Sequence, residues 1–527
     1  MGEKIVLLEF ADEADAFLRY CENQATSPDC FHIIALQPQV QVFLKNLNIP
    51  YENTLPYFSN QSHARALSKS EEWYQFLATT VDIEDGPEIK ETYNNTFLFY
   101  LRFYIHHYIM HIEVLSSIYE KHKIESIYAC VYQNDVRPNN PPLIQDDERY
   151  AGIIAKIFSQ THNIAFQEIP TQFKPKVIQS NKSLLIGFKE NTEKMISRLY
   201  KFLLVKNFKH KKVILLTTTG YNIGNLARRL KKELPTSRWA VISASKPSRC
   251  IIGFILRSLS EVFKTPSTSH FSYAELSMGS FQSTNTLSNE SYCQLEKGID
   301  LIIYKFRKYW PNCFTYNGVN FTGLILERIE KDLKPHLVSL YLESKALREI
   351  LRLLEVRLVI SPYARDTSLM IGGLCQNLRI PALMISHGTL IRPKNKMESI
   401  EYYHLGKSLI LSEFYNYVAI QTPSEEEHLH YYQCNNQMIK TGPLIFSKPY
   451  PTLRESIKNK MLGYETDKKI LLYPDNTKER FTTRFQVYET FDEFLSSSIH
   501  LVDAINEIEG VHLVIRLHPG KSINPAD

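Results

Sequence analysis

The sequence predicts an α/β fold built on mostly parallel sheets. Short apolar runs alternate with longer amphipathic segments along the chain, as they do where helices connect strands. Most of these runs are rich in leucine or β-branched residues and lack polar alternation, which is typical of strands buried on both faces. With 527 residues, of which 44% are hydrophobic, the chain is long enough for about three to four domains.

Ten apolar runs are predicted to be strands. They are residues 4–9, 32–36, 126–132, 213–218, 239–243, 356–361, 382–386, 417–421, 469–473 and 511–517. Between the third run and its predecessor lies an aromatic segment, residues 96–120, whose apolar surface is interrupted by charged and histidine side chains. This composition favours a helix that faces the core over a membrane span.

Composition shifts divide the chain into units. The predicted units are an N-terminal α/β unit at 1–180, a basic amphipathic linker at 181–212, a Rossmann-like half at 213–445 with a helical insertion at 245–350, a linker at 446–467, and the start of a second Rossmann-like half at 468–527. The last unit has only about 60 residues, below the usual ~100–200 of a domain, so we expect this half to be incomplete.

Charge and cysteine usage restrict the partners. A net charge of +5 is small for this length and argues against a nucleic-acid binder. The eight cysteines form no Cys-x-x-Cys pair, so we expect reduced thiols, no metal and a cytoplasmic location. Residues 198–212 carry six Lys or Arg and no acid. They suit either peripheral contact with the inner face of an anionic membrane or a solvated connecting helix.

The sharpest motif is Arg-Leu-His-Pro-Gly at residues 516–520, after a run predicted to be a buried strand. The carboxyl ends of strands in open α/β sheets are where ligands bind. Arg516 would offset the charge that develops on a leaving phosphate, His518 would protonate it, and Gly520 would let the backbone approach it. The alternative is an ordinary polar strand end at which Pro519 stops the strand.

A second strand end carries Ser-His-Gly-Thr at residues 386–389. His387 suits donation to a phosphate or proton transfer near neutral pH, and Gly388 and Thr389 suit close approach of a ligand to the backbone. The alternative is a histidine satisfied by backbone groups in a tight turn.

Further candidate residues follow other strands. Asp366 lies after the strand that ends near Ser361, where it is either a helix N-cap or an acid that acts as general base or binds a substrate hydroxyl. Gly220 and Asn222 lie in a strand-to-helix loop that suits an acceptor site or a simple turn. Gly442 marks the turn at which one sheet ends.

The order of these motifs resembles that of bacterial surface-carbohydrate biosynthesis proteins. It runs through Ser-His-Gly-Thr at 386–389, Gln-Thr-Pro-Ser at 421–424, Thr-Gly-Pro-Leu-Ile at 441–445 and Ile-Arg-Leu-His-Pro at 515–519, and residues 35–51 look like the opening of such proteins. These proteins are similar to GT-B-fold transferases that build capsule, lipopolysaccharide and teichoic-acid polymers, including glycerophosphotransferases that use CDP-glycerol.

The resemblance implies two Rossmann-like halves across a cleft, preceded here by the extra N-terminal unit. The first half would hold a polysaccharide or lipid-linked acceptor, and the second a CMP-, CDP- or UDP-linked donor, without a metal or other cofactor. His518 matches the histidine that assists departure of the nucleotide, and His387 matches a His-Gly site that faces the cleft.

The expected function is therefore transfer of a sugar or glycerophosphate from a nucleotide-activated donor to a surface polymer. Two alternatives stay open. A nucleotide-sugar epimerase would need a base and an acid in one site and no lipid-linked acceptor. A non-catalytic binding or assembly subunit would explain an incomplete donor half, and it would not bind a nucleotide.

Overall fold

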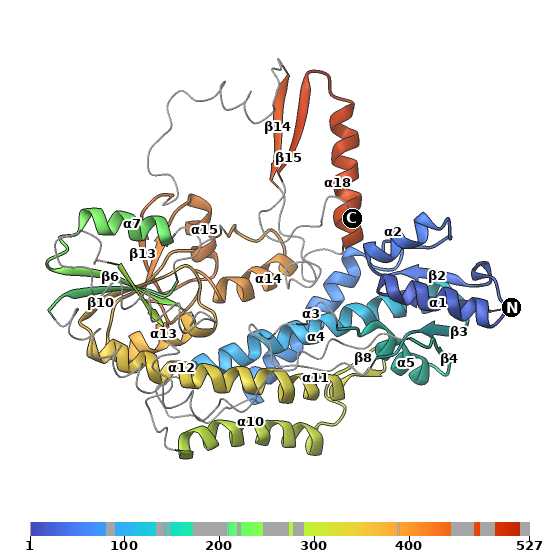
Figure 1. Ribbon diagram of the computed structural model, residues 1–527, viewed down its shortest axis with the longest axis horizontal. Helices are drawn as coiled ribbons and strands as arrows, with labels where there is room; N and C mark the ends of the chain where they lie inside the picture. Colours follow the sequence, from blue (N-terminus) through green and yellow to red (C-terminus); the bar gives the residue numbers. More distant parts are fainter. Residues whose placement is uncertain are drawn as a thin grey trace, which may run out of the picture.

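The computed structural model confirms the predicted α/β class with Rossmann-like parallel sheets (Figure 1). The residues that it describes are 2–80, 90–132, 142, 144, 148–171, 208, 210–218, 223–245, 273–277, 289–386, 388, 390–443, 468–474 and 491–516. Within them lie a four-stranded, a seven-stranded and a two-stranded parallel sheet, together with one short antiparallel hairpin.

The N-terminal sheet has the strand order β2-β1-β3-β4. Its elements are β1 (Glu3–Leu8), α1 (Ala11–Asn23), the 3-10 turn Pro28–Cys30, β2 (His32–Ala35), α2 (Pro38–Asn46), β3 (Ile124–Ala129), α5 (Ala151–Thr161) and β4 (Ala165–Glu168). Alternate residues of β1 enter different cores, with Ile5 packed in one and Val6 in the other. Both faces of the sheet are therefore covered, as the unbroken apolar run of β1 predicts.

The seven-stranded sheet has the order β13-β12-β11-β10-β5-β6-β7, with every neighbouring pair parallel. Its strands are β5 (Lys212–Leu216), β6 (Trp239–Ser245), β7 (Tyr273–Ser277), β10 (Val356–Ser361), β11 (Ala382–Met384), β12 (Tyr417–Ile420) and β13 (Gln437–Lys440). The chain moves outward from β5 to β7, returns to the other side of β5, and moves outward again from β10 to β13. The strand order thus reverses between β5 and β10.

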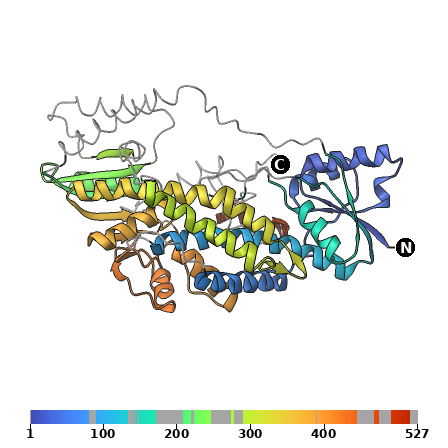
Figure 2. The ribbon, with the colours of Figure 1, turned by 90° about the horizontal axis from the view of Figure 1, so that it is seen from below.

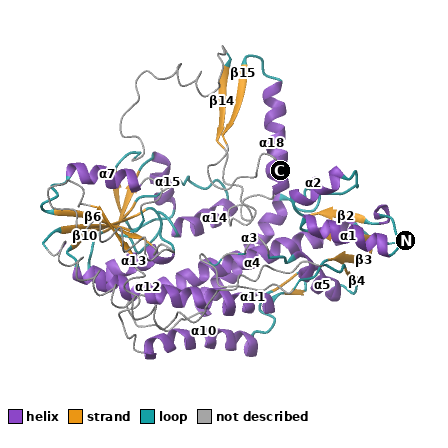
Figure 3. Ribbon diagram, viewed as in Figure 1, coloured by secondary structure: helices purple, strands orange, loops and turns teal. Residues whose placement is uncertain are grey.

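A layer of helices lies between the two larger sheets (Figures 2 and 3). Its elements are α3 (Asn60–Thr80), α4 (Lys90–Lys121), α10 (Asn289–Tyr309), the hairpin of β8 (Thr315–Tyr316) and β9 (Val319–Asn320), α11 (Thr322–Arg328), the π-helical turn Ile329–Leu333 and α12 (Lys334–Leu353). Helix α4 is buried on nearly all sides, which confirms that residues 96–120 form a helix facing the core.

The remaining helices cover or flank the seven-stranded sheet. They are α7 (Ile223–Glu233), α13 (Asp366–Leu378), α14 (Lys396–Lys407) and α15 (Pro423–Tyr431). Helix α15 begins where the sequence changes from strand to Gln-Thr-Pro-Ser. Thr422 accepts from the Glu425 backbone N–H at 3.3 Å, the Glu425 carboxylate accepts from the Thr422 N–H at 3.3 Å, and Pro423 occupies the first helical turn.

The third sheet pairs β14 (Lys469–Pro474) with β15 (Val511–Arg516), with α18 (Phe491–Asn506) beside them. The first turn of α18 is hydrogen-bonded to the N-terminal unit. Asp492 accepts from the Thr54 N–H at 2.8 Å and from Gln41 Nε2 at 2.8 Å. The prediction that residues 511–517 form a buried strand is wrong for the described residues, because β15 is only partly covered and Ile515 is 44% exposed.

A buried ion cluster fastens the helical layer to the N-terminal unit. Arg328 is fully buried and pairs with Glu148 and, at 3.3 Å, with Asp332. Tyr104 on α4 donates to the same Asp332 carboxylate at 2.7 Å. Each buried charge therefore depends on the others, because an unpaired charge in this environment would lose its hydration without compensation.

We predict that Arg328→Ala lowers the free energy of unfolding by about 3–5 kcal/mol, because it leaves buried carboxylates without their cation. Urea denaturation of the full chain measures this loss. The matched control is Arg307→Ala, since Arg307 is 60% exposed in its ion pair with Glu330 and should cost less than about 1 kcal/mol. Equal losses in the two variants would contradict a stabilising role for the buried cluster.

Candidate functional site

The reversal of strand order between β5 and β10 marks a candidate site at the carboxyl-end edge of the seven-stranded sheet. In open α/β sheets, ligands bind outside the carboxyl ends of the strands at such a point. Here Thr217 follows β5 and Ser361 ends β10, and their buried hydroxyl groups lie 2.7 Å apart. The apolar strands β5 and β10 thus end in a pair of hydroxyl groups at the point where the strand order reverses.

Neighbouring strands extend this polar edge. After β11, Ser386 Oγ accepts from the Gly388 N–H at 3.3 Å and donates to the Gly388 carbonyl at 2.5 Å. After β12, Gln421 Nε2 donates to the Ser386 carbonyl at 2.7 Å. A Cβ atom at Gly388 would meet no atom within 4 Å, so its backbone borders open space. Close approach of a ligand to this backbone is therefore sterically allowed.

Several residues singled out from the sequence follow the carboxyl ends of strands in this sheet. Gly388 follows β11, Asp366 follows β10, and Gly442 follows β13 with a φ of 68° that favours glycine. Four others lie outside the described residues: Gly220 and Asn222, after β5 in the sequence, and His387 and Thr389, which flank Gly388.

The residues of the C-terminal motif are placed apart from this edge. Arg516 ends β15 on the two-stranded sheet and is exposed, and His518 and Gly520 lie outside the described residues. Of the basic linker, Phe208 is buried in the core and Lys212 begins β5, whereas 198–207 are outside the described residues.

The interpretation of Asp366 as a helix N-cap is wrong. The N-cap of α13 is Arg365, whose backbone is extended, and Asp366 is the first helical residue, with a left-handed φ of 47°. Its carboxylate has partners on other helices. It accepts from the Tyr100 hydroxyl at 2.8 and 2.9 Å and lies 2.9 Å from His336 Nε2. Helices α4 and α12 thus hold this acid in place beside the sheet edge.

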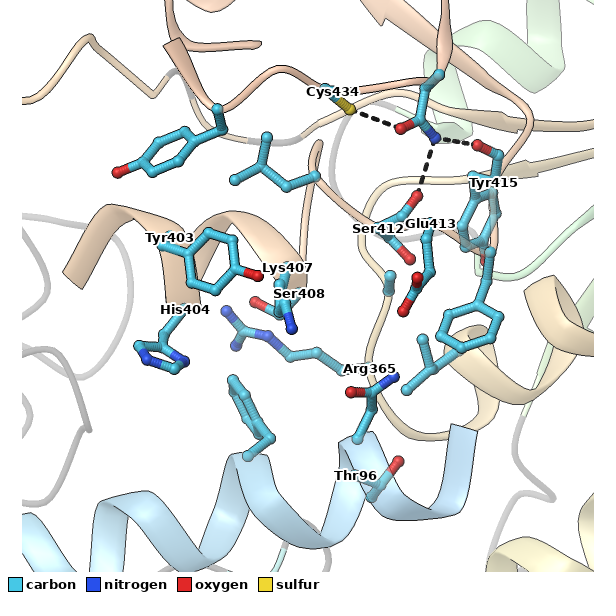
Figure 4. Close-up of a pocket in the computed structure, with 18 of the residues that line it drawn as sticks. Thr96, Arg365, Tyr403, His404, Lys407, Ser408, Ser412, Glu413, Tyr415 and Cys434 are labelled. Atoms are coloured by element: carbon cyan, nitrogen blue, oxygen red, sulfur yellow. Dashed lines mark hydrogen bonds between the residues drawn. The ribbon is translucent and has the colours of Figure 1, made fainter. Parts of the chain in front are cut away.

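A pocket of about 520 Å³ adjoins Arg365 and Asp366 (Figure 4). It lies between α4, the start of α13 and the end of α14, and Arg365 reaches into it toward Ser408 and Lys407. Arg365 also packs over the ring of Phe99 at 5.3 Å, and Lys407 over the ring of Tyr403 at 4.9 Å. Two cations held by aromatic rings therefore face one cavity.

The protonation states within the pocket are set by burial and by close neighbours. Burial opposes the charged form of Lys407, but the adjacent phenols of Tyr74 and Tyr403 outweigh it and raise the pKa of this lysine. Burial, together with the nearby charge of Arg102, lowers the pKa of His404 to about 4 despite its hydrogen bond to Glu71. At neutral pH the lysine is charged and the histidine neutral, which suits binding of an anion more than proton transfer by His404.

Sequence reasoning missed most of the pocket. Tyr100, His336 and Lys407 lie on helices in runs that resemble ordinary core or surface positions. They reach the site only because the helical layer packs against the sheet, and no local spacing signals that contact. The hydroxyl of Thr217 could have been found, since it directly follows a predicted strand.

No helix among the described residues has the length and apolar character needed to span a bilayer.

Comparison with known proteins gives a weak likeness in fold. No protein-family model and no curated protein matches the chain. Among solved structures it is similar to a UDP-GlcNAc 2-epimerase from Methanocaldococcus jannaschii, with a TM-score of 0.27 and 12% sequence identity. The match covers 59% of this chain and 66% of the epimerase, which is just under two thirds of the epimerase's length. It is similar to the same extent to Phytolacca americana UGT2 complexed with UDP-2fluoro-glucose and pterostilbene, over 59% of this chain and 72% of that one. Scores this low assign no function.

We predict that His404 makes the protein sensitive to mild acid. As pH falls from 6.5 to about 4, the unfolded chain takes up a proton at this histidine and the folded chain does not, so stability decreases by up to about 3 kcal/mol. Chemical denaturation at a series of pH values measures this slope.

The variant His404→Gln should flatten the slope in this window, whatever it does to stability at neutral pH. The exposed His430 offers the control, because His430→Gln should leave the slope unchanged. An unaltered slope in His404→Gln would show that another group causes any acid sensitivity.

Proposed function

We propose that this chain is a transferase that moves a sugar or glycerophosphate from a nucleotide-activated donor to a cell-surface polysaccharide or lipid-linked acceptor. The observation that carries the proposal is the reversal of strand order between β5 and β10, where Thr217, Ser361 and Asp366 lie at one sheet edge. The order of motifs in the sequence also supports a transferase. The proposal does not rest on the weakly similar solved structures.

In this proposal Asp366 is the general base. The acceptor hydroxyl oxygen attacks the donor, its proton passes to the Asp366 carboxylate, and the bond from the donor to the nucleotide phosphate breaks. Tyr100 and His336 keep the carboxylate in the lining of the pocket, with the Tyr100 hydroxyl donating to it. Such fixed geometry favours the reaction because no side chain must reorient during the transfer.

The leaving nucleotide needs positive charge and a proton. Arg365 and Lys407, which both line the pocket, would offset phosphate charge from the pocket side. His518, two residues after Arg516, would protonate the departing phosphate, and His387, Gly388 and Thr389 would face the bound substrate. Because Arg516 lies on the separate two-stranded sheet, this scheme requires that sheet to approach the seven-stranded one during the reaction. The donor would be CMP-, CDP- or UDP-linked, and no metal or other cofactor takes part in this scheme.

We predict that the full chain binds one of CMP, CDP or UDP in a saturable manner. Arg365→Gln should weaken this binding about tenfold or more, because a hydrogen bond to a charged group contributes about 1.5–3 kcal/mol. Isothermal titration calorimetry measures both effects.

The control is Arg307→Gln, which removes an exposed arginine on α10 that does not line the pocket and should leave the affinity unchanged. Binding of none of the three nucleotides would contradict the proposed function and would favour a non-catalytic assembly subunit.

We predict that His518→Ala and Asp366→Asn each reduce turnover by about 10²–10⁴-fold, the usual contribution of a general acid or base. Release of nucleotide from a CMP-, CDP- or UDP-activated donor in the presence of acceptor provides the assay. Asp300→Asn is the control, because Asp300 is an exposed partner of Lys334. Full activity of His518→Ala would refute its assigned role, and interconversion of donor epimers without acceptor would identify an epimerase.

A further inference from the structure

A cluster of histidine and carboxylate side chains lies at the amino ends of β1 and β2 in the four-stranded sheet, which is a different sheet from that of the candidate site. Glu3 begins β1, His32 begins β2, and His122 directly follows α4. Ile5 pairs with His32 and the Glu3 N–H donates to the Lys123 carbonyl at 2.8 Å, so the parallel register brings all three side chains together. One ligand atom from each lies within 4.8 Å of the others.

Both imidazoles present the same nitrogen to the same carboxylate. Glu3 Oε2 lies 3.0 Å from His122 Nδ1 and 3.3 Å from His32 Nδ1. The two rings are close to each other, with their centroids 4.6 Å apart. Ligand atoms around a tetrahedral zinc ion at bonds of ~2.0–2.1 Å are separated by about 3.3 Å, so these spacings are near those of a metal site.

The Nε2 atoms of both rings contact the hydroxyl group of Tyr57. The Tyr57 hydroxyl lies 2.9 Å from His122 Nε2 and 3.3 Å from His32 Nε2. It donates its proton to Glu52 Oε2 at 2.5 Å. The Tyr57 oxygen is therefore an acceptor for the rings, and each Nε2 must carry a hydrogen to make its contact favourable.

With a hydrogen on each Nε2, two neutral rings have no hydrogen left on Nδ1 to donate to Glu3. A neutral imidazole that carries hydrogen on Nε2 has a lone pair on Nδ1. Two such lone pairs and a carboxylate oxygen then converge and repel one another unless a cation lies among them. Two imidazolium rings would also satisfy the count, but they would place two positive charges side by side.

We propose that Glu3, His32 and His122 bind a divalent transition-metal ion, Zn²⁺ by preference, through one carboxylate oxygen and two Nδ1 atoms. Imidazole and carboxylate ligands suit this ion, and a water molecule would complete its tetrahedron. Glu52 and Tyr57 are the outer partners that fix the ring tautomers, as such groups do in known zinc sites. Glu3 is 45% exposed, which gives the ion a path from solvent.

The site would fasten three segments that are distant in the sequence: β1, β2 and the turn between α4 and β3. It is separate from the proposed catalytic edge, and none of its residues lines the pocket beside Asp366. The outcome of a metal-binding experiment is therefore independent of whether the transferase proposal is correct.

We predict that the full chain, stripped with EDTA and dialysed, binds one more equivalent of Zn²⁺ than His32→Gln or His122→Gln. Isothermal titration calorimetry gives this difference, and Zn²⁺ should raise the Tm of the wild type more than that of either variant. Glu52→Gln should weaken the affinity of this site about 10-fold, the lower end of the usual effect of an outer partner. His430→Ala, which removes an exposed histidine elsewhere, should match the wild type.

Two further measurements keep the proposal open to refutation. Co²⁺ bound at this site should absorb in the visible without an intense thiolate charge-transfer band, and Glu3→Gln, altering an exposed side chain, tests the site if the histidine variants do not fold. Equal Zn²⁺ stoichiometry and affinity in the wild type and folded variants would overturn the proposal. A wild type that binds no Zn²⁺ and gains stability as the histidines become protonated would instead establish the pair of imidazolium rings.

Discussion

The burial of α4 is the constraint on which the rest of the structure depends. This helix of 32 residues lies at the centre of the molecule and carries polar groups along its buried length. A buried charge or hydroxyl must find a partner, and the partners of α4 come from separate parts of the chain. Arg102 pairs with Glu401 on α14 at 2.5 Å, and Tyr100 donates to Asp366. The hydrogen bonds and ion pairs that the buried polar groups of α4 require therefore hold the helical layer against the seven-stranded sheet.

The same constraint forms the candidate site. A doubly wound sheet supplies a polar edge at its reversal point, but its side chains alone leave that edge open to solvent. Helix α4 closes one wall of the pocket and also holds the Asp366 carboxylate through Tyr100. The candidate site at the sheet edge is thus coupled to a helix that begins in the N-terminal part of the chain, so a substitution that shifts α4 would alter both the stability of the fold and the geometry of this site.

The sequence predicted the central strands well and the edge strands poorly. Every predicted run coincides with a strand, and most of these strands are continuous and apolar because both of their faces are covered. The strands that were not predicted are β4, β7 and β13, which lie at sheet edges, and β8 and β9, which form the short hairpin. Both β4 and β13 are largely exposed, so they need no apolar run and leave little periodic signal.

The site was predictable only where it follows the strands. Asp366, Gly388 and Gly442 were found because a strand end is visible in the sequence, whereas Tyr100, His336 and Lys407 required the packing of helices that no local pattern encodes. The cap assignment of Asp366 failed for a related reason. Its carboxylate is drawn to Tyr100 and His336, and these long-range partners replace the local bond to the helix end.

The attachment of α18 has a mechanical consequence. Asp492 fixes the first turn of α18 on the N-terminal unit, while β14 and β15 lie alongside the part of the helix that is farther from Asp492, with Leu472 half exposed (Figure 1). A helix of 16 residues is about 24 Å long, so a tilt of about 5° at the root displaces the far end by about 2 Å. The helix is a lever arm: a small rearrangement around Thr54 and Gln41 is amplified at the strands, and a force on the strands is concentrated on a few hydrogen bonds at the root.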